Sequence, residues 1–306
     1  MNLTPINQLN LFGFEDELKD LVRLYKQNKL PNKILFSGQK GSGKATLAYH
    51  LINKILSENE EYPYDLENYQ INDNNRSFKL IQNSTNPNFH LIDLFPEKKN
   101  IDINQIRNLI NNLNKSSFNN KPRFVLIDNI EFLNKSSINA LLKNLEEPNE
   151  NIYFILINSG KKILNTLKSR CLNFKISFSN AKAFEISNKL LGKDLLEIVN
   201  KSLINYYITP GNILNLIKFS TENDLDLKNL DLKDFLIILI KNGYYKKDTP
   251  IKYLIYDFFE FFIRNCSNNS NSNNYNYFLK RINDLKRYNL DDESFFIEFE
   301  TKLLNV

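Results

Sequence analysis

Two spacings of hydrophobic residues alternate along the first part of the chain. Short apolar runs predict β-strands near residues 34–36, 89–93, 123–128, 152–157 and 174–178. The segments between most of these runs carry apolar residues three or four positions apart, which is the spacing of an amphipathic helix. We expect helices of this kind at 136–147 and, shorter, at 161–168. Asp102 and Gln105 form a capping-box pattern at the start of the helix before the third run. We therefore predict an α/β fold for this part of the chain.

The pattern weakens or changes in several longer segments. Residues 57–88 are polar and have no clear period, so we expect an irregular insertion or long loop there. Residues 179–222 predict short helices, one of them around 195–203, residues 223–230 a linker, and the chain after that a further set of helices. The strongly aromatic segment 253–262 is interpreted mainly as core, with part of it left open as an interface. The Asn- and Ser-rich segment 267–277 predicts a flexible loop between helices.

Residues 34–46 contain the most informative local motif. Gly38, Gly43 and Lys44 match the phosphate-loop pattern G-x-x-x-x-G-K-[ST] up to its last position, with Gly41 inside the loop. An apolar strand precedes the motif and a helical pattern follows it. In this arrangement backbone N–H groups and a helix N-terminus surround a phosphate, and the lysine adds a positive charge.

Two substitutions argue against ATP hydrolysis at this loop. Ala45 stands where a hydroxyl would ligate Mg²⁺, and Thr46 comes one residue too late, about 100° away around the helix. Asp128 ends a buried strand and fits the metal-side carboxylate of such a site. The next residue, Asn129, cannot act as a base, and we expect Glu131 to point elsewhere.

Asn158, after a further strand, has a polar side chain placed to sense a terminal phosphate. The candidate residues of a degraded nucleotide site are therefore Gly38, Gly41, Gly43, Lys44, Thr46, Asp128 and Asn158. We predict that no cofactor is required and no metal is bound, with weak binding of ATP or ADP left open.

Composition narrows the function classes. The 306 residues suffice for two or three domains, and the net charge of +5 permits contact with nucleic acid without arguing for it. Cys171 and Cys266 have no Cys or His at ligand spacing, so we expect neither a Cys-based zinc site nor a disulfide framework, and a cytoplasmic location. His50 and His90 are interpreted as structural, and no signal peptide or membrane-spanning run is predicted.

Three motifs in fixed order carry a family resemblance. They are Leu-Leu-Lys-Asn-Leu-Glu-Glu-Pro at 141–148, Phe-Ile-Leu-Ile-Asn-Ser at 154–159 and Leu-Lys-Ser-Arg-Cys at 167–171. Together they resemble the core of the AAA+ clamp-loader subunits of bacterial DNA polymerase III, from about residue 11 to 215. Within that family, residues 41–48 are similar to the degenerate loop of the delta-prime type, and residues 209–211 to its lid motif.

The resemblance implies the architecture. We expect an AAA+ P-loop core with a five-stranded parallel sheet flanked by helices at residues 1–178. A small helical lid would follow at 179–225, and an all-α collar domain that mediates oligomerisation at 226–306. The four-cysteine zinc module that many relatives carry after the phosphate-loop helix is absent, because residues 57–88 contain no cysteine.

The resemblance also implies a role in DNA replication. Such subunits belong to a pentameric loader that opens the sliding clamp and closes it around primed DNA. The implied partners are tau/gamma-type ATPases and delta, with the clamp contacted indirectly, primer–template DNA reached through the complex, and no membrane. Arg170 would be an arginine finger supplied in trans, since a guanidinium is permanently charged and its fork fits phosphate oxygens.

Several alternatives remain at this point. Ala45 and Asn129, with Asn212 where active relatives carry a lid arginine, favour a subunit of the polymerase III holoenzyme that has no ATPase activity alone. A catalytically active tau/gamma-type ATPase that uses Lys44, Thr46 and Asp128 is the main rival. The others are a pure scaffold in which Arg170 is a relict, and direct binding of DNA by basic residues of the core.

Overall fold

The chain forms two compact units, Met1–Phe178 and Ser179–Val306. This structure is a computed structural model. It describes residues 4–95, 98–115, 119–146, 151–160, 162–204, 208–247, 251, 254–266, 272–288 and 292–304. The predicted separation of a lid at 179–225 from a collar at 226–306 lies inside the second unit and stays a prediction.

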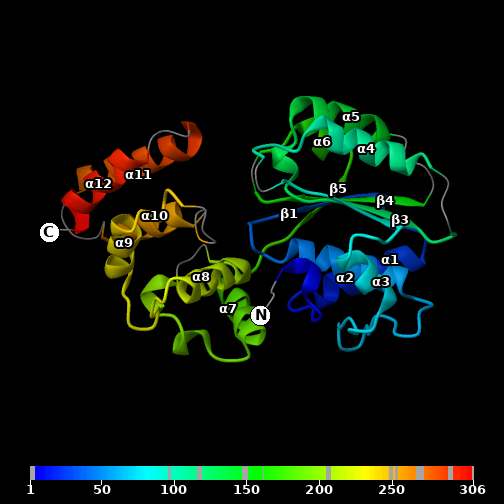
Figure 1. Cartoon of the computed structure of the whole chain (residues 1–306), viewed down its shortest axis with the longest axis horizontal. Helices are drawn as coiled ribbons and strands as arrows, with labels where there is room; N and C mark the ends of the chain where they lie inside the picture. Colours follow the sequence, from blue (N-terminus) through cyan, green and yellow to red (C-terminus); the bar gives the residue numbers. More distant parts are fainter. Residues whose placement is uncertain are drawn as a thin grey trace. The chain divides into compact units, whose positions relative to one another are not determined.

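A five-stranded sheet forms the centre of the first unit, as predicted (Figure 1). Its strands are β1 (Lys33–Ser37), β2 (Phe89–Ile92), β3 (Arg123–Ile127), β4 (Ile152–Asn158) and β5 (Leu172–Lys175). The order across the sheet is β2-β3-β4-β1-β5, and every neighbouring pair is parallel. All carboxyl ends therefore lie at one edge, where parallel α/β sheets place their ligand sites.

Helices cover both faces of this sheet (Figure 1). One face carries α1 (Glu15–Lys26), α2 (Lys44–Leu56) and α3 (Arg76–Gln82), and the other carries α4 (Ile103–Leu113), α5 (Lys135–Glu146) and α6 (Asn165–Lys168). The central strands are buried on both sides, which explains why their sequences are continuous apolar runs without polar alternation.

Local sequence patterns predicted the positions of most of these elements correctly. The capping box predicted at Asp102 and Gln105 is present, because Asp102 accepts from the N–H of Gln105 and the Gln105 side chain accepts from the N–H of Asp102. The helix expected at 136–147 is α5, and its predicted end at 147–148 lies outside the described residues.

Three element boundaries were predicted wrongly. The last strand lies at Leu172–Lys175 and not at 174–178, because it pairs with β1 from Ile34 onward and leaves the sheet where β1 turns at Gly38. Of the helix expected at 161–168, the described part is helical only over Asn165–Lys168. The helix expected at 195–203 is two 3₁₀ turns, Leu195–Glu197 and Lys201–Leu203.

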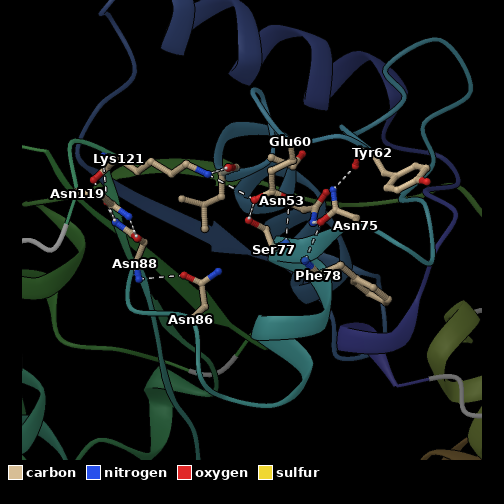
Figure 2. A network of polar contacts seen from close by, with 12 residues as sticks. Asn53, Glu60, Tyr62, Asn75, Ser77, Phe78, Asn86, Asn88, Asn119 and Lys121 are labelled. Atoms are coloured by element: carbon tan, nitrogen blue, oxygen red, sulfur yellow. Dashed lines mark hydrogen bonds and ion pairs between the residues drawn. The ribbon is translucent and has the colours of Figure 1, made fainter.

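The polar segment 57–88 is more ordered than its sequence predicts. It contains α3, whose first turn is capped by the Asn75 carboxamide oxygen accepting from the N–H of Phe78 at 2.7 Å. The same oxygen accepts from Asn53 of α2 at 2.9 Å, and the Asn75 amide donates to the carbonyl of Tyr62 at 2.7 Å (Figure 2). Asn75 is fully buried, so one side chain joins two parts of this insertion to α2.

A second group of contacts ties the insertion to the start of β3 (Figure 2). Glu60 accepts from both the backbone N–H and the hydroxyl of Ser77. Lys121 donates to the carbonyl of Leu56 at 2.6 Å and lies 3.4 Å from Glu60. These polar contacts order segment 57–88, which has no cysteines to form a zinc module.

The second unit is helical. Its helices are α7 (Asn180–Leu191), α8 (Pro210–Glu222), α9 (Leu232–Lys241), α10 (Ile255–Cys266), α11 (Ser272–Tyr288) and α12 (Glu293–Phe299). One buried cluster of side chains runs from Leu195 to Leu304 and is rich in phenylalanine, so the aromatic segment near residue 258 is core, as predicted. Among the described residues, no helix combines the length and apolarity needed to cross a bilayer.

The flexible loop predicted at residues 267–277 is wrong in its second half. Residues from Ser272 onward belong to α11, while 267–271 lie outside the described residues. The low-complexity composition obscured a helix whose buried residues Phe278, Ile282 and Leu285 follow a helical spacing.

Candidate functional site

The phosphate loop lies between β1 and α2, as predicted. Gly41 and Gly43 adopt left-handed backbone conformations with φ of 78° and 83°, and Gly43 is the N-cap of α2. A Cβ atom at Gly38 would lie 2.1 Å from the carbonyl oxygen of Ile176, which follows β5. The conformation of this loop therefore requires glycine at these positions.

Lys44 is buried and bonds to its own loop. Its ammonium donates to the carbonyl oxygens of Gly38 at 3.1 Å and Gln39 at 2.5 Å, and lies 3.4 Å from the hydroxyl of Ser42. Burial lowers the pKa of Lys44 to about 8, although the carboxylates of Asp128 and Glu131 favour its charged form. The positive charge of the motif is thus present but is hydrogen-bonded to its own loop.

Carboxylates gather at the same edge of the sheet. Asp93 follows β2 and Asp128 follows β3, and the Asn129 amide donates to Asp93 at 2.8 Å. Burial raises the pKa of the Asp128 carboxyl to about 6, and the neighbouring Asp93 carboxylate adds to the shift. Sequence reasoning missed Asp93, although its position after an apolar run resembles that of Asp128.

Asn158 and Glu131 both accept hydrogen bonds from backbone N–H groups that follow β4 at this edge of the sheet. The Asn158 carboxamide oxygen accepts from the N–H of Gly160 at 2.6 Å. Glu131 accepts from the N–H of Ser159 at 3.3 Å and acts electrostatically on Asp128 and Lys44. Glu131 therefore lies within electrostatic reach of the predicted site residues, while its described hydrogen bond is with the backbone after β4; the expectation that it points elsewhere stays a prediction.

These residues do not fit a Mg²⁺–ATP site. Ala45 supplies no hydroxyl at the first turn of α2, and the half-buried Thr46 lies one position further around the helix. The Asp93 carboxylate that accompanies Asp128 already accepts from Asn129 and from the N–H of Leu94. Among the described residues, no group of three or more His, Cys, Asp or Glu side chains is arranged to hold a metal.

The two histidines have surroundings that suit structural roles. His50 is fully buried on α2, with one ring nitrogen 2.9 Å from the hydroxyl of Tyr64 and the other 3.1 Å from the carbonyl of Gln8. Burial lowers the pKa of His50 to about 4 and that of His90 below its usual value.

Arg170 lies in the turn between α6 and β5. Leu167 before it is buried, and Cys171 after it packs against the core beneath α5, so this turn is anchored on both sides. Burial raises the pKa of the Cys171 thiol to about 11. The Arg170 side chain stays about 31% exposed and donates to Glu146 and to the carbonyl of Thr166.

Arg170 and the phosphate loop occupy opposite edges of the sheet. Leu172, two residues after Arg170, pairs with Ile34 at the start of β1, whereas Gly38 follows the end of β1. Four residues of parallel strand separate Ile34 from Gly38, which is about 13 Å at 3.3 Å per residue. The arrangement therefore separates Arg170 from the nucleotide-type site of its own chain.

In the second unit, Asn212 lies in the first turn of α8. Its backbone N–H donates to the capping hydroxyl of Thr209 at 3.4 Å, and its side chain is buried. A buried carboxamide supplies no positive charge at this position.

Comparison with known proteins identifies the family. The family described as "DNA polymerase III, delta subunit" matches residues 14–180, which is more than half of the chain. The chain belongs to this family. The match spans the sheet, the phosphate loop and the Arg170 turn, and so confirms the clamp-loader family resemblance seen in the sequence.

Curated members of the clamp-loader family are similar over part of their length. A gamma/tau subunit of Mycoplasma genitalium is 30% identical over 65% of this chain and 32% of its own. A delta-prime subunit of Buchnera aphidicola (from Schizaphis graminum) is 30% identical over 52% and 46%, and the Bacillus subtilis delta-prime subunit is 25% identical over 68% and 59%. The matched segments thus span between 32% and 59% of the length of these three relatives.

A solved structure agrees on the fold of the clamp-loader family. A DNA polymerase III gamma subunit-related protein from Thermotoga maritima gives a TM-score of 0.52 at 16% identity, covering 95% of this chain and 99% of the other. This likeness supports the AAA+ architecture. The relatives include both delta-prime and gamma/tau subunits at similar identity.

Proposed function

We propose that this chain is the delta-prime subunit of the DNA polymerase III clamp loader and supplies Arg170 in trans to an ATPase subunit beside it. In this role it assists ATP-dependent loading of the sliding clamp onto primed DNA. Its partners are gamma/tau-type ATPases and delta, and it reaches the clamp and primer–template DNA through the complex.

The position of Arg170 carries this proposal. A partly exposed guanidinium, anchored by Leu167 and Cys171, lies at the sheet edge opposite the phosphate loop of its own chain. A residue in this position serves an ATP site on another subunit. A permanently charged fork suits the oxygens of a transferring phosphoryl group, and such a finger contributes roughly 10³–10⁵ in rate.

The state of the chain's own loop favours the delta-prime assignment over an active gamma/tau-type ATPase. Lys44 is bonded to loop carbonyls, Ala45 has no hydroxyl, and Asn129 holds Asp93. None of these groups handles metal or activates water. The chain alone therefore hydrolyses no ATP and binds ATP or ADP weakly, without needing a cofactor.

The test is the ATPase activity of the reconstituted loader with clamp and primed DNA, comparing wild type with Arg170→Ala. We expect the variant complex to assemble and to lose turnover at one site, while the isolated chain shows no ATPase activity. Normal ATP turnover by the variant complex would instead indicate that this chain acts only as a scaffold. Micromolar Mg-ATP affinity of the isolated chain by calorimetry, with hydrolysis, would instead support the gamma/tau-type alternative.

A further inference from the structure

Arg170 is held by two acceptors from different helices. Its Nε and Nη2 donate to the same Glu146 carboxylate oxygen at 3.0 and 2.5 Å, and its Nη1 donates to the carbonyl of Thr166 at 2.8 Å. Glu146 is the last residue of α5 and Thr166 lies in α6. The guanidinium is therefore fixed from two sides, although its side chain is partly exposed.

The number of donors shows what this arrangement leaves available. A guanidinium has five N–H donors, and the contacts to Glu146 and Thr166 use three of them. The other two N–H groups have no acceptor among the residues that the structure describes, and two is the number that a bidentate contact with phosphate oxygens requires. The contacts restrain the rotation of a long side chain without using up its recognition capacity.

The contact has little importance for the stability of the fold. The Glu146 side chain is about 51% exposed and that of Arg170 about 31%. Ion pairs this close to solvent contribute little to folding free energy, because water screens them and ordering long side chains costs entropy. A contact that joins two elements yet adds little stability has its main effect on where the guanidinium points.

We propose that Glu146 is a positioning residue that preorganises Arg170 for a phosphate group on a neighbouring subunit. This inference rests on the proposed trans role of Arg170. A fixed fork loses less side-chain entropy on contact and meets the transferring group in one orientation. Glu146 itself touches neither nucleotide nor metal in this scheme.

The experiment uses the reconstituted loader with clamp and primed DNA. Glu146→Ala removes the acceptor, and Glu146→Gln keeps an acceptor oxygen without its charge. Glu185→Ala is the matched control, because Glu185 forms an exposed ion pair on α7 with Lys189 at 2.7 Å. Each variant is also combined with Arg170→Ala, and kcat and KM for ATP are measured separately.

We expect Glu146→Ala to lower kcat about tenfold, the rate change that corresponds to one charge-assisted hydrogen bond of about 1.4 kcal/mol. KM and complex assembly should stay unchanged, Glu146→Gln should restore part of the loss, and Glu185→Ala should have no effect. In the Arg170→Ala background, Glu146→Ala should lower kcat no further, since the residue acts through Arg170.

The possible failures are distinguishable. If Arg170→Ala lowers kcat but Glu146→Ala does not, the positioning role is wrong and the arginine finger is supported. The same holds if Glu146→Ala lowers kcat by the same factor in the Arg170→Ala background. An increase in kcat with Glu146→Ala would mean that the carboxylate restrains Arg170 from acting, which also overturns the proposal. If Arg170→Ala has no effect, the finger and its positioning residue fail together.

Discussion

Replacing Asn75 by alanine tests whether the polar contacts around α3 hold the insertion 57–88 in place. The side chain is fully buried, and its oxygen accepts from the N–H of Phe78 and from the Asn53 amide. Its amide donates to the carbonyl of Tyr62. Alanine would remove all three hydrogen bonds and leave groups on three segments without these partners.

The magnitude follows from these contacts. Loss of the helix cap costs about 1 kcal/mol, and each buried polar group left without a partner costs about 1–3 kcal/mol. One such group remains besides the cap, the amide of the buried Asn53, because Tyr62 is exposed and water can replace the lost bond to its carbonyl. We therefore expect Asn75→Ala to lower the free energy of opening this segment by about 2–4 kcal/mol.

Native-state hydrogen exchange of the α3 amides is the appropriate assay, because a chain with two units need not unfold in a single step. Asn74→Ala is the control, since Asn74 is the exposed neighbour and the one described hydrogen bond of its side chain is with the ammonium of Lys79, while its backbone N–H, which alanine keeps, donates to Asn72. We expect the control to change the exchange free energy by less than about 0.5 kcal/mol. If Asn75→Ala behaves like Asn74→Ala, the network does not hold this segment.

Two further predictions concern pH. The pKa of Asp128 is raised to about 6 from 3.8, so burying its ionised form destabilises the fold. This destabilisation is complete above pH 6 and disappears as the pH falls toward 4. Asp128→Asn should therefore stabilise the core by up to about 3 kcal/mol at pH 7.5 and by little at pH 4, measured by urea unfolding; equal effects at both values would contradict this. The pKa of His50 is lowered to about 4 from 6.5, so the stability from its neutral form is fully present above pH 6.5 and is lost as the pH falls to 4. His50→Gln should flatten this acid loss, and an unchanged pH slope would show that His50 does not cause it.

Much of the fold follows from local patterns that tertiary contacts do not override. The apolar runs of β1, β3 and β4 predict strands because both faces of the sheet are covered. The capping box at Asp102 is a local device, so the sequence alone predicts the start of α4. Helix α3 was missed because its cap, Asn75, is one of many asparagines in a polar segment and functions through tertiary contacts.

The candidate site shows the same division between local and tertiary information. The glycines, Lys44 and Asp128 were predicted from a motif that depends on residue spacing. The partner of Asn129 and the contribution of Asp93 depend on how separate strands align at one edge of the sheet. No short-range pattern encodes the pairing of Glu146 with Arg170, which are 24 residues apart.

The close approach of Gly38 to the backbone of Ile176 has a consequence for how such motifs persist. Any side chain at residue 38 would collide with the main chain that leaves β5, whatever the loop binds. Gly43 is similarly constrained by its left-handed conformation and by the ring of Phe14, 2.9 Å from where a Cβ would lie. Packing within the fold is therefore sufficient to require glycine at both positions, whatever residue stands at position 45. A glycine signature of this kind records the path of the backbone and is not by itself evidence that the loop binds a nucleotide.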